Sequence, residues 1–196
     1  LSLSSAASDV YKRQDIDKRN ENIQIYINGS FYKRDDAKIS VFDSGFLLGD
    51  GIWEGIRLVN GKWLFLDEHL CRLFEGCKAI DIEINMTFDD IKKAISDTQE
   101  INKMSGSAHA RLMITRGDKI KPFQQPSLSK KGINFVIIME HSVESPNSDG
   151  VHLVTVPQVR GLPMSQDPKL NSHSKLNCMI ACIQENKAVG DEALML

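Results

Sequence analysis

The sequence has little of the features that mark a membrane, nucleic-acid-binding or secreted protein. No hydrophobic run approaches the length of a bilayer span. The formal net charge is only -2, so there is no electrostatic reason to expect nucleic acid or an anionic membrane as a partner. With 41% hydrophobic and 26% charged residues, the composition is that of a soluble globular protein. We therefore expect a cytoplasmic protein.

Cysteine is also scarce, with four residues in a chain of 196. So few thiols, in a chain that is neither small nor visibly secreted, fit a reducing compartment better than a disulfide framework. Cys178 and Cys182 stand four apart on a predicted helix, which leaves a metal site conceivable. Their spacing matches no familiar zinc pattern. Buried, unreactive thiols are the favoured interpretation, and no metal is expected.

Two common enzyme motifs are missing. The Gly-Asp-Gly triplet at 49–51 lacks the third glycine of a dinucleotide fingerprint and leads into strand-like residues rather than a helix. No Gly-x-Ser-x-Gly elbow occurs, so serine hydrolase chemistry has no support.

What is present is a glycine-rich block, SVFDSGFLLGDGIWEGIR, at residues 40–57. Four glycines at that density indicate tight turns, or a backbone that another segment approaches closely. The block is followed by DEHLCRL at residues 67–73 and, much later, by SHSKLN at residues 172–177.

Hydrophobic periodicity predicts alternating strands and helices. Two Asn-Gly pairs, at 28–29 and 60–61, are typical of hairpin turns. Predicted strands cover residues 23–27, 41–42, 52–59, 63–66, 108–115, 133–139 and 151–156, with a last strand beginning near residue 192.

Three helices are predicted between these strands. Asp67 is the expected cap of a helix that runs to about Ile80 and buries one apolar stripe. Thr87, with an acid three residues later, indicates a capped helix to about residue 102. The third helix covers about residues 177–188, and no internal repeat is visible.

Together, the glycine-rich block, His-x-x-Arg-Leu at residues 69–73 and SHSKLN resemble the class IV aminotransferases, the fold type IV pyridoxal-phosphate enzymes. That family includes branched-chain and D-amino-acid aminotransferases and aminodeoxychorismate lyase. The resemblance covers about residues 23–196 and implies an α/β (α+β) fold of two domains, with pyridoxal 5'-phosphate as cofactor and a homodimer as the full-length state.

Four segments are expected. Residues 1–14 contain DVYKRQ, which looks like a translated sequencing adaptor, and are predicted to be a non-native leader. A small α/β domain covers 15–145, and a linker rich in turn-forming residues covers 146–150. Residues 151–196 begin a larger cofactor-binding domain that stops inside EALML. The resemblance implies that part of the site lies beyond this point, so residues 15–196 alone are expected to have little or no activity.

The resemblance assigns Lys175 to the Schiff base with the cofactor. Free lysine has a pKa near 10.4, so such a lysine needs a site that lowers it. From the residues alone, an exposed lysine before a helix is the alternative. Lys169, which also begins a Lys-Leu-Asn triplet, is a rival for the same role.

Arg72 is implied to bind the cofactor phosphate, which suits a planar guanidinium that stays charged. A solvated surface arginine is the alternative, and His69 is expected to orient its neighbours. Trp53 corresponds to an aromatic of the substrate pocket in relatives, with a core aromatic as the alternative.

Arg111 matches a position that holds an acidic substrate in branched-chain enzymes. Arg116 and Lys121 are alternatives for gripping a carboxylate. Leu48 departs from the Tyr or Phe of relatives, which leaves the substrate open.

The expected function is transfer of an amino group from an amino acid, branched-chain-like as the best guess, to a 2-oxo acid such as 2-oxoglutarate. A lyase of the aminodeoxychorismate type, which releases pyruvate without an amino acceptor, is the second hypothesis. An inactive fragment is the third.

Overall fold

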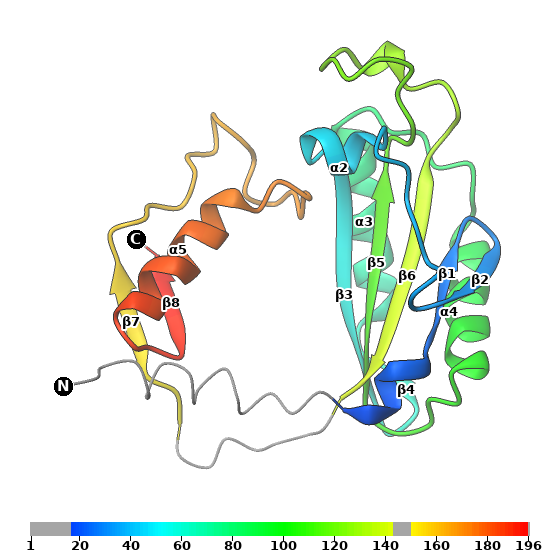
Figure 1. The fold of residues 1–196 in the computed structure, drawn as a ribbon, viewed down its shortest axis with the longest axis horizontal. Coiled ribbons are helices and arrows are strands. Elements are labelled where there is room, and N and C mark those ends of the chain that lie inside the picture. The colour runs from blue at the N-terminus through cyan, green and yellow to red at the C-terminus, as the bar shows by residue number, and fades with distance from the viewer. Residues whose placement is uncertain (1–16, 143–149, 196) are drawn as a thin grey trace. The chain divides into compact units, whose positions relative to one another are not determined.

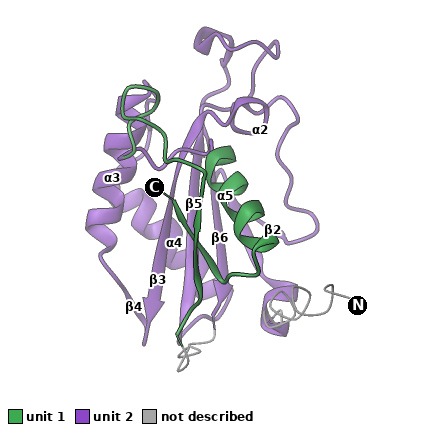
Figure 2. Ribbon diagram, turned by 90° about the vertical axis from the view of Figure 1, so that its left-hand side faces the viewer, with its two compact units in different colours: residues 1–16, 145–168, 175–196 green, residues 17–144, 169–174 purple. Residues whose placement is uncertain are grey.

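The computed structural model describes residues 17–142 and 150–195, and Figure 1 shows the order of their helices and strands. Contacts divide these residues into two units (Figure 2). Of the described residues, one unit comprises 17–142 together with Lys169–Ser174, and the other contains 150–168 and 175–195. The predicted leader and most of the predicted linker lie outside the described residues.

The first unit is a six-stranded antiparallel sheet with strand order β2-β1-β6-β5-β3-β4. The strands are β1 (Gln24–Ile27), β2 (Ser30–Lys33), β3 (Gly51–Val59), β4 (Lys62–Trp63), β5 (Ala108–Thr115) and β6 (Asn134–His141). Both Asn-Gly pairs form the predicted hairpin turns, since Asn28 and Asn60 have positive φ, as do the glycines after them.

Two helices, α3 (Leu66–Ala79) and α4 (Phe88–Ile101), cover one face of this sheet (Figure 1). Their buried side chains meet the inward side chains of the strands, as expected for a sheet with one covered face. The core of this unit includes Leu70 and Leu73 of α3, Ile91 and Ile95 of α4, and Leu112 of β5. The apolar stripe predicted for α3 is therefore confirmed.

Helix α4 begins as predicted. The Thr87 hydroxyl accepts from the Asp90 backbone N–H at 3.2 Å, and the Asp90 carboxylate accepts from the Thr87 N–H at 2.8 Å. This reciprocal capping box satisfies two donors that the first helical turn leaves without partners. At the other end, the Asn102 amide donates to the Gln24 carbonyl at 2.9 Å and fastens the helix to β1.

The predicted start of α3 is wrong by two residues. Phe65, in a left-handed conformation with φ 52°, precedes the first helical residue, and no side chain caps this end. Asp67 lies inside the first turn, where a carboxylate is favoured by the helix dipole. The strand predicted at 63–66 is correspondingly shorter and ends at Trp63.

The strand predicted at Val41–Phe42 is also wrong, because these residues form a turn before the short helix α2 (Ser44–Leu48). The buried Asp43 caps this helix by accepting from the Phe46 N–H at 3.1 Å, and it also accepts from Thr115 and Asn134. Partners so distant in the chain favour a helix start that no local alternation indicates.

The second unit is a β-α-β arrangement. Strands β7 (Leu153–Val156) and β8 (Glu192–Met195) pair in parallel, and α5 (Leu176–Lys187) connects them along the chain after an irregular stretch. Contacts join α5 to both strands. The parallel pairing fits a connection long enough to contain a helix. Across residues 17–142 and 150–195, no helix has both the length and the apolar character of a membrane span.

Candidate active site

The first unit contains a fully buried carboxylate, that of Glu54. Its side chain is on β3, has 0% exposure, and faces the helices in line with Ile52 and Ile56. It accepts three hydrogen bonds from α3: Arg72 Nε to Oε1 at 2.6 Å, Arg72 Nη2 to Oε2 at 2.6 Å, and His69 Nδ1 to Oε2 at 2.8 Å. A buried charge is tolerated only when it is paired and hydrogen-bonded in this way.

Unlike the buried Glu54, its partner Arg72 is partly exposed. Its side chain is 52% exposed although two of its nitrogens bond to Glu54. That bidentate contact raises its pKa further above the ordinary value. A guanidinium has five N–H donors, so three remain for another ligand. Nη1 has no hydrogen-bond partner among the described residues, and the outer edge of Arg72 therefore fits a phosphate group.

Arg116 makes a similar pair but has little left to offer. Its Nε and Nη2 donate to Asp50 at 2.8 and 3.0 Å, and its Nη2 and Nη1 also donate to the Ile80 and Asp81 carbonyls, each at 2.7 Å. Burial opposes ionisation of Asp50, but the bonds from Arg116 and Ser44 outweigh it and lower the Asp50 pKa. Arg116 is thus occupied at the C-terminal end of α3, whereas the rival Lys121 is exposed.

The open face of the sheet brings the two predicted substrate residues together. The Arg111 guanidinium lies 4.2 Å from the centre of the Trp53 ring, in a cation–π contact. Arg111 of β5 pairs with Gly55 of β3 in the ladder, and a side chain at Gly55 would begin 3.3 Å from the Trp53 ring. The glycine leaves space beside the tryptophan for this contact.

A cavity of about 510 Å³ adjoins this pair on the same face. Its lining is mostly apolar, with Ile25, Ile27 and Ile138 among its members, and its polar groups include Arg111 and His109. Burial, followed by the positive charge of Arg111 and of Arg57, lowers the His109 pKa. His109 was not predicted, although its alternation with buried Ala108 and Ala110 places it on this face.

The glycine-rich block and the SHSKLN motif meet inside the first unit. Residues 171–173 run beside the start of β3: the Trp53 N–H donates to the Asn171 carbonyl and the His173 N–H to the Gly51 carbonyl, both at 2.9 Å. A Cβ at Gly49, where φ is 68°, would lie 2.5 Å from the Ser174 hydroxyl. The prediction of a closely approached backbone is confirmed. Burial lowers the pKa of His173.

Lys175 follows directly and begins the second unit, where it precedes α5 and its carbonyl accepts from the Met179 N–H at 2.9 Å. It is half-buried, while the rival Lys169 is exposed. The predicted residues therefore occupy three places. Trp53 and Arg111 lie on the open face of the sheet, Arg72 lies on α3 and contacts the helix-covered face, and Lys175 lies in the other unit.

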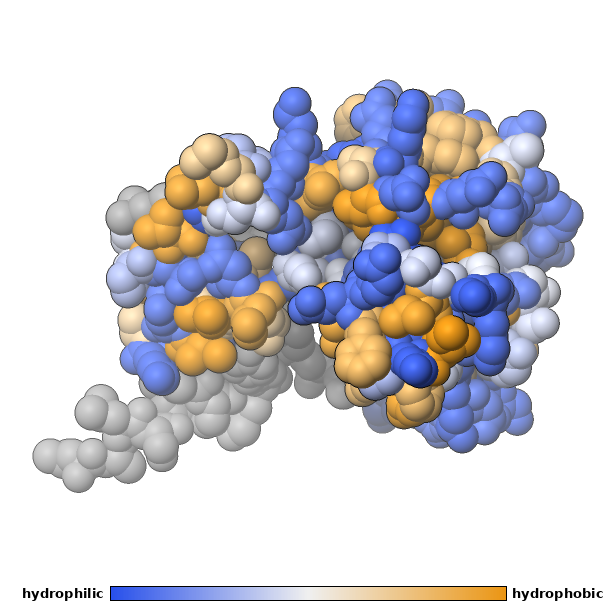
Figure 3. All heavy atoms as spheres, turned by 90° about the horizontal axis from the view of Figure 1, so that it is seen from above, coloured by the Kyte–Doolittle hydropathy of each residue, from blue (hydrophilic) through white to orange (hydrophobic). Residues whose placement is uncertain are grey.

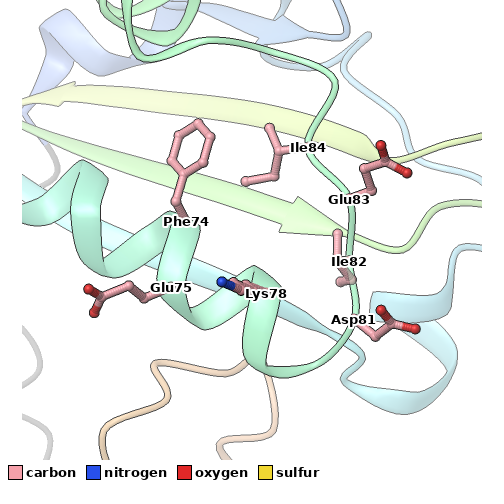
Figure 4. A pocket seen from close by; sticks show the side chains of 7 residues that line it. All are labelled: Phe74, Glu75, Lys78, Asp81, Ile82, Glu83 and Ile84. Carbon is pink, nitrogen blue, oxygen red and sulfur yellow. The ribbon is translucent and has the colours of Figure 1, made fainter.

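Glu54 is the functional candidate that the sequence reasoning missed. The alternation of IWEGIRL was a usable signal, because it puts Glu54 on the same side as two isoleucines that had to be buried. A second cavity of about 510 Å³, on the outer side of α3, holds none of the expected site residues. Figure 4 shows its apolar side chains Phe74 and Ile84, with the carboxylates of Glu75 and Glu83 pointing away from them.

The family model for amino-transferase class IV matches residues 51–196, and the chain belongs to this family. It is 35% identical over 178 residues to branched-chain-amino-acid aminotransferase-like protein 2 of Arabidopsis thaliana, covering 90% of this chain and 32% of that protein. It is 36% identical over 175 residues to a Methanocaldococcus jannaschii protein provisionally named a branched-chain-amino-acid aminotransferase, covering 89% and 59%.

Similarity extends to a lyase and to solved folds. The aminodeoxychorismate lyase of Bacillus subtilis is 35% identical over 107 residues, which cover 54% of this chain and 36% of the lyase. The branched-chain aminotransferase of the archaeon Thermoproteus uzoniensis, solved with norvaline, has a TM-score of 0.78 at 22% identity, covering 89% of this chain and 60% of that one. That likeness confirms the predicted fold class. The chain spans less than two thirds of each of these proteins.

Proposed function

We propose that the whole protein is an aminotransferase that moves an amino group from a branched-chain-like amino acid to a 2-oxo acid such as 2-oxoglutarate, with pyridoxal phosphate as cofactor. The observation that carries this proposal is the open-face cavity with Arg111 at its edge. A transaminase must accept an apolar amino acid and an acidic 2-oxo acid in turn. Isoleucines suit the first substrate, and an arginine suits the carboxylate of the second.

The cofactor has support of its own from a solved relative. A branched-chain amino acid aminotransferase whose structure contains pyridoxamine 5'-phosphate has a TM-score of 0.80 against this chain, at 22% identity. The outward edge of Arg72 is a group in this chain that suits the phosphate of such a ligand.

The residues divide the work as follows. The outward edge of Arg72 binds the phosphate of the cofactor, and Lys175 carries the cofactor and moves a proton to and from the substrate carbon. The cofactor, when bound, supplies an aldehyde that takes up the amino group and a ring that accepts negative charge. Trp53 covers the substrate and holds Arg111 by the contact at 4.2 Å.

Turnover of the full-length protein tests the proposal. With L-leucine and 2-oxoglutarate we expect glutamate to form, with the parallel-line kinetics of a group carrier that alternates between two substrates. Glutamate formation that stays at the level of a protein-free control would contradict it.

The second candidate is a lyase that eliminates pyruvate, which the similarity to the Bacillus subtilis enzyme favours. Incubation with aminodeoxychorismate and no 2-oxo acid separates the two. Stoichiometric pyruvate under those conditions identifies the lyase, and its absence together with leucine-dependent glutamate identifies the transaminase.

The lysine assignment has its own test. The protein loaded with pyridoxal phosphate is reduced with borohydride, digested and mapped, and we expect the pyridoxyl label on Lys175. Lys175→Arg should abolish the label, and Lys169→Arg is the matched control that should keep it. A label on Lys169 would mean that the first Lys-Leu-Asn triplet holds the cofactor.

We also propose a homodimer in the cytoplasm. Large apolar side chains reach the surface of the molecule (Figure 3), and in the first unit Val41 is 66% and Phe46 72% exposed. A second subunit is a physical reason for such exposure. Sedimentation of the full-length protein tests the oligomer, and a monomer at micromolar concentration would contradict it.

A further inference from the structure

Burying the side chain of Glu54 at this position costs free energy. The carboxyl group has no exposure, yet it is paired with Arg72 and lies between isoleucines on the helix-facing side of β3. Replacing a buried ion pair by apolar residues is often neutral or stabilising, so the pair is not explained by stability alone. Its partner Arg72 remains half-exposed, which makes the arginine, rather than the carboxylate, the member that can meet a ligand.

The neighbouring pair of Asp50 and Arg116 shows what a structural ion pair looks like in this unit. Arg116 donates hydrogen bonds to Asp50 and to two carbonyls at the end of α3, and its side chain is 13% exposed. Among the described residues, Arg72 donates hydrogen bonds to Glu54 only, through Nε and Nη2. Its Nη1 group therefore remains available to a ligand. The two pairs share their chemistry and differ in what remains available.

We propose that Glu54 is a positioning residue that holds the Arg72 guanidinium in one plane, with its outer edge presented to a phosphate monoester. Two parallel bonds fix the plane of a guanidinium, whereas one bond leaves it free to rotate. The inference rests on the proposed function, in which that phosphate belongs to the cofactor.

His69 completes the arrangement. It lies one helical turn from Arg72 and donates from Nδ1 to Oε2, the same oxygen that accepts from Arg72 Nη2. This third bond opposes rotation of the carboxylate about its last side-chain bond. The His69 side chain is 23% exposed and that of Glu54 is fully buried, so the histidine contacts the carboxylate from a partly exposed position on α3. It is therefore a second positioning residue that acts through Glu54.

Positioning and charge predict opposite results for one substitution. Glu54 carries a negative charge next to a proposed anion site, so removing that charge should tighten phosphate binding if charge alone mattered. Glu54→Gln keeps the shape but offers one acceptor and one N–H₂ donor to two guanidinium donors. If Glu54 positions Arg72, the same substitution weakens phosphate binding.

The experiment compares pyridoxal phosphate with pyridoxal, which lacks the phosphate, by absorbance titration of the full-length apoprotein. We expect Glu54→Gln to raise the Kd for pyridoxal phosphate at least tenfold and to change that for pyridoxal less than twofold. Inorganic phosphate should compete less effectively with pyridoxal phosphate in the variant. Asp50→Asn is the matched control, since it breaks the structural pair and should leave the ratio of the two Kd values unchanged.

Each outcome has a meaning. Equal or tighter binding of pyridoxal phosphate by Glu54→Gln, or an equal loss for both ligands, overturns the positioning role. His69→Gln, which removes only the third bond, gives a milder test and should raise the pyridoxal phosphate Kd severalfold if Glu54→Gln does not fold. Arg72→Gln tests the proposed function itself: an unchanged ratio of the two Kd values would remove Arg72 from the phosphate site.

Discussion

The carbonyl oxygen of Gly132 lies where a side chain on Gly117 would begin, because a Cβ built at Gly117 is only 1.8 Å from it. Both glycines have a φ of 83°, and the space beside Gly132 is open to at least 4 Å. The pair therefore separates two costs of replacing a glycine, which are backbone strain and collision.

Gly132→Ala should lose roughly 1–2 kcal/mol of unfolding free energy, the cost of a left-handed alanine. Gly117→Ala has the same strain and adds an overpacking cost of about 1–3 kcal/mol. Urea unfolding of both variants measures the difference. Equal losses would show that the two turns move apart at no cost.

The helix cap at Thr87 makes a second prediction. Thr87→Ala should lower the unfolding free energy by about 1 kcal/mol, because it removes the acceptor of the Asp90 N–H at the start of α4. Thr87→Ser keeps the hydroxyl and is the control, for which a change of a few tenths is expected. A loss as large for serine as for alanine would assign the effect to the methyl group.

Stability should fall in mild acid. Burial lowers the pKa values of His173 and His109 below the ordinary 6.5, so near neutral pH the unfolded chain binds more protons than the folded one. The unfolding free energy therefore rises with pH between the lowered pKa values and 6.5. The contribution of these two histidines to stability is lost as pH falls through that range.

His173→Asn should flatten that slope between pH 7.5 and 5.5, measured by urea unfolding at about half-unit steps of pH. In alkaline solution the imidazole is neutral in both states, and wild type and variant should show the same slope there. Asp50 affects stability in a more acidic pH range. Because its pKa is lowered, its contribution to the unfolding free energy is lost only as pH falls through the ordinary value of 3.8 and below. An unchanged slope for the variant in the mildly acidic range would contradict the assignment.

The pair of Trp53 and Arg111 should separate the two substrate classes in the full-length protein. Arg111→Gln is expected to raise the KM for 2-oxoglutarate by about 10–100-fold, the loss of a charged hydrogen bond of about 1.5–3 kcal/mol. The KM for leucine should stay within about twofold, because that side chain contacts the apolar part of the cavity.

Trp53→Leu removes the ring under the guanidinium and should weaken 2-oxoglutarate binding severalfold, in line with a cation–π contact of about 0.5–2 kcal/mol. Trp63→Leu is the matched control, since Trp63 donates to Gln99 at 3.0 Å and has no part in the proposed pocket. An equal rise in the leucine KM for Arg111→Gln would remove the arginine from substrate selection.

Much of the fold was predictable because local patterns carried it. The strand at Ala108–Thr115 was predicted with its observed bounds, since apolar residues alternate along it, and α4 was predicted from Thr87 and its acid three residues later. The errors fall where distant partners decide the local structure. Asp43 starts α2 with the help of residues 72 and 91 positions away, which no window of sequence includes.

The candidate site divides in the same way. Trp53 and Arg111 were predicted one by one, and their contact depends on the register of β3 against β5, which is a long-range property. The bond between Glu54 and Arg72 depends on how α3 lies on β3. Alternation indicated that Glu54 faces inward, but only the packed helix shows which cation it meets.

The short segment at residues 171–173 has a practical consequence for anyone who wishes to express the sheet by itself. A piece ending at residue 144 would leave the backbone groups at Gly51 and Trp53 without the segment that now bonds to them. Such an uncovered edge invites pairing between molecules and precipitation. Joining residues 169–174 to residue 144 through a flexible Gly-Ser connector would restore the missing partner, and the recombinant sheet would then remain dispersed in buffer.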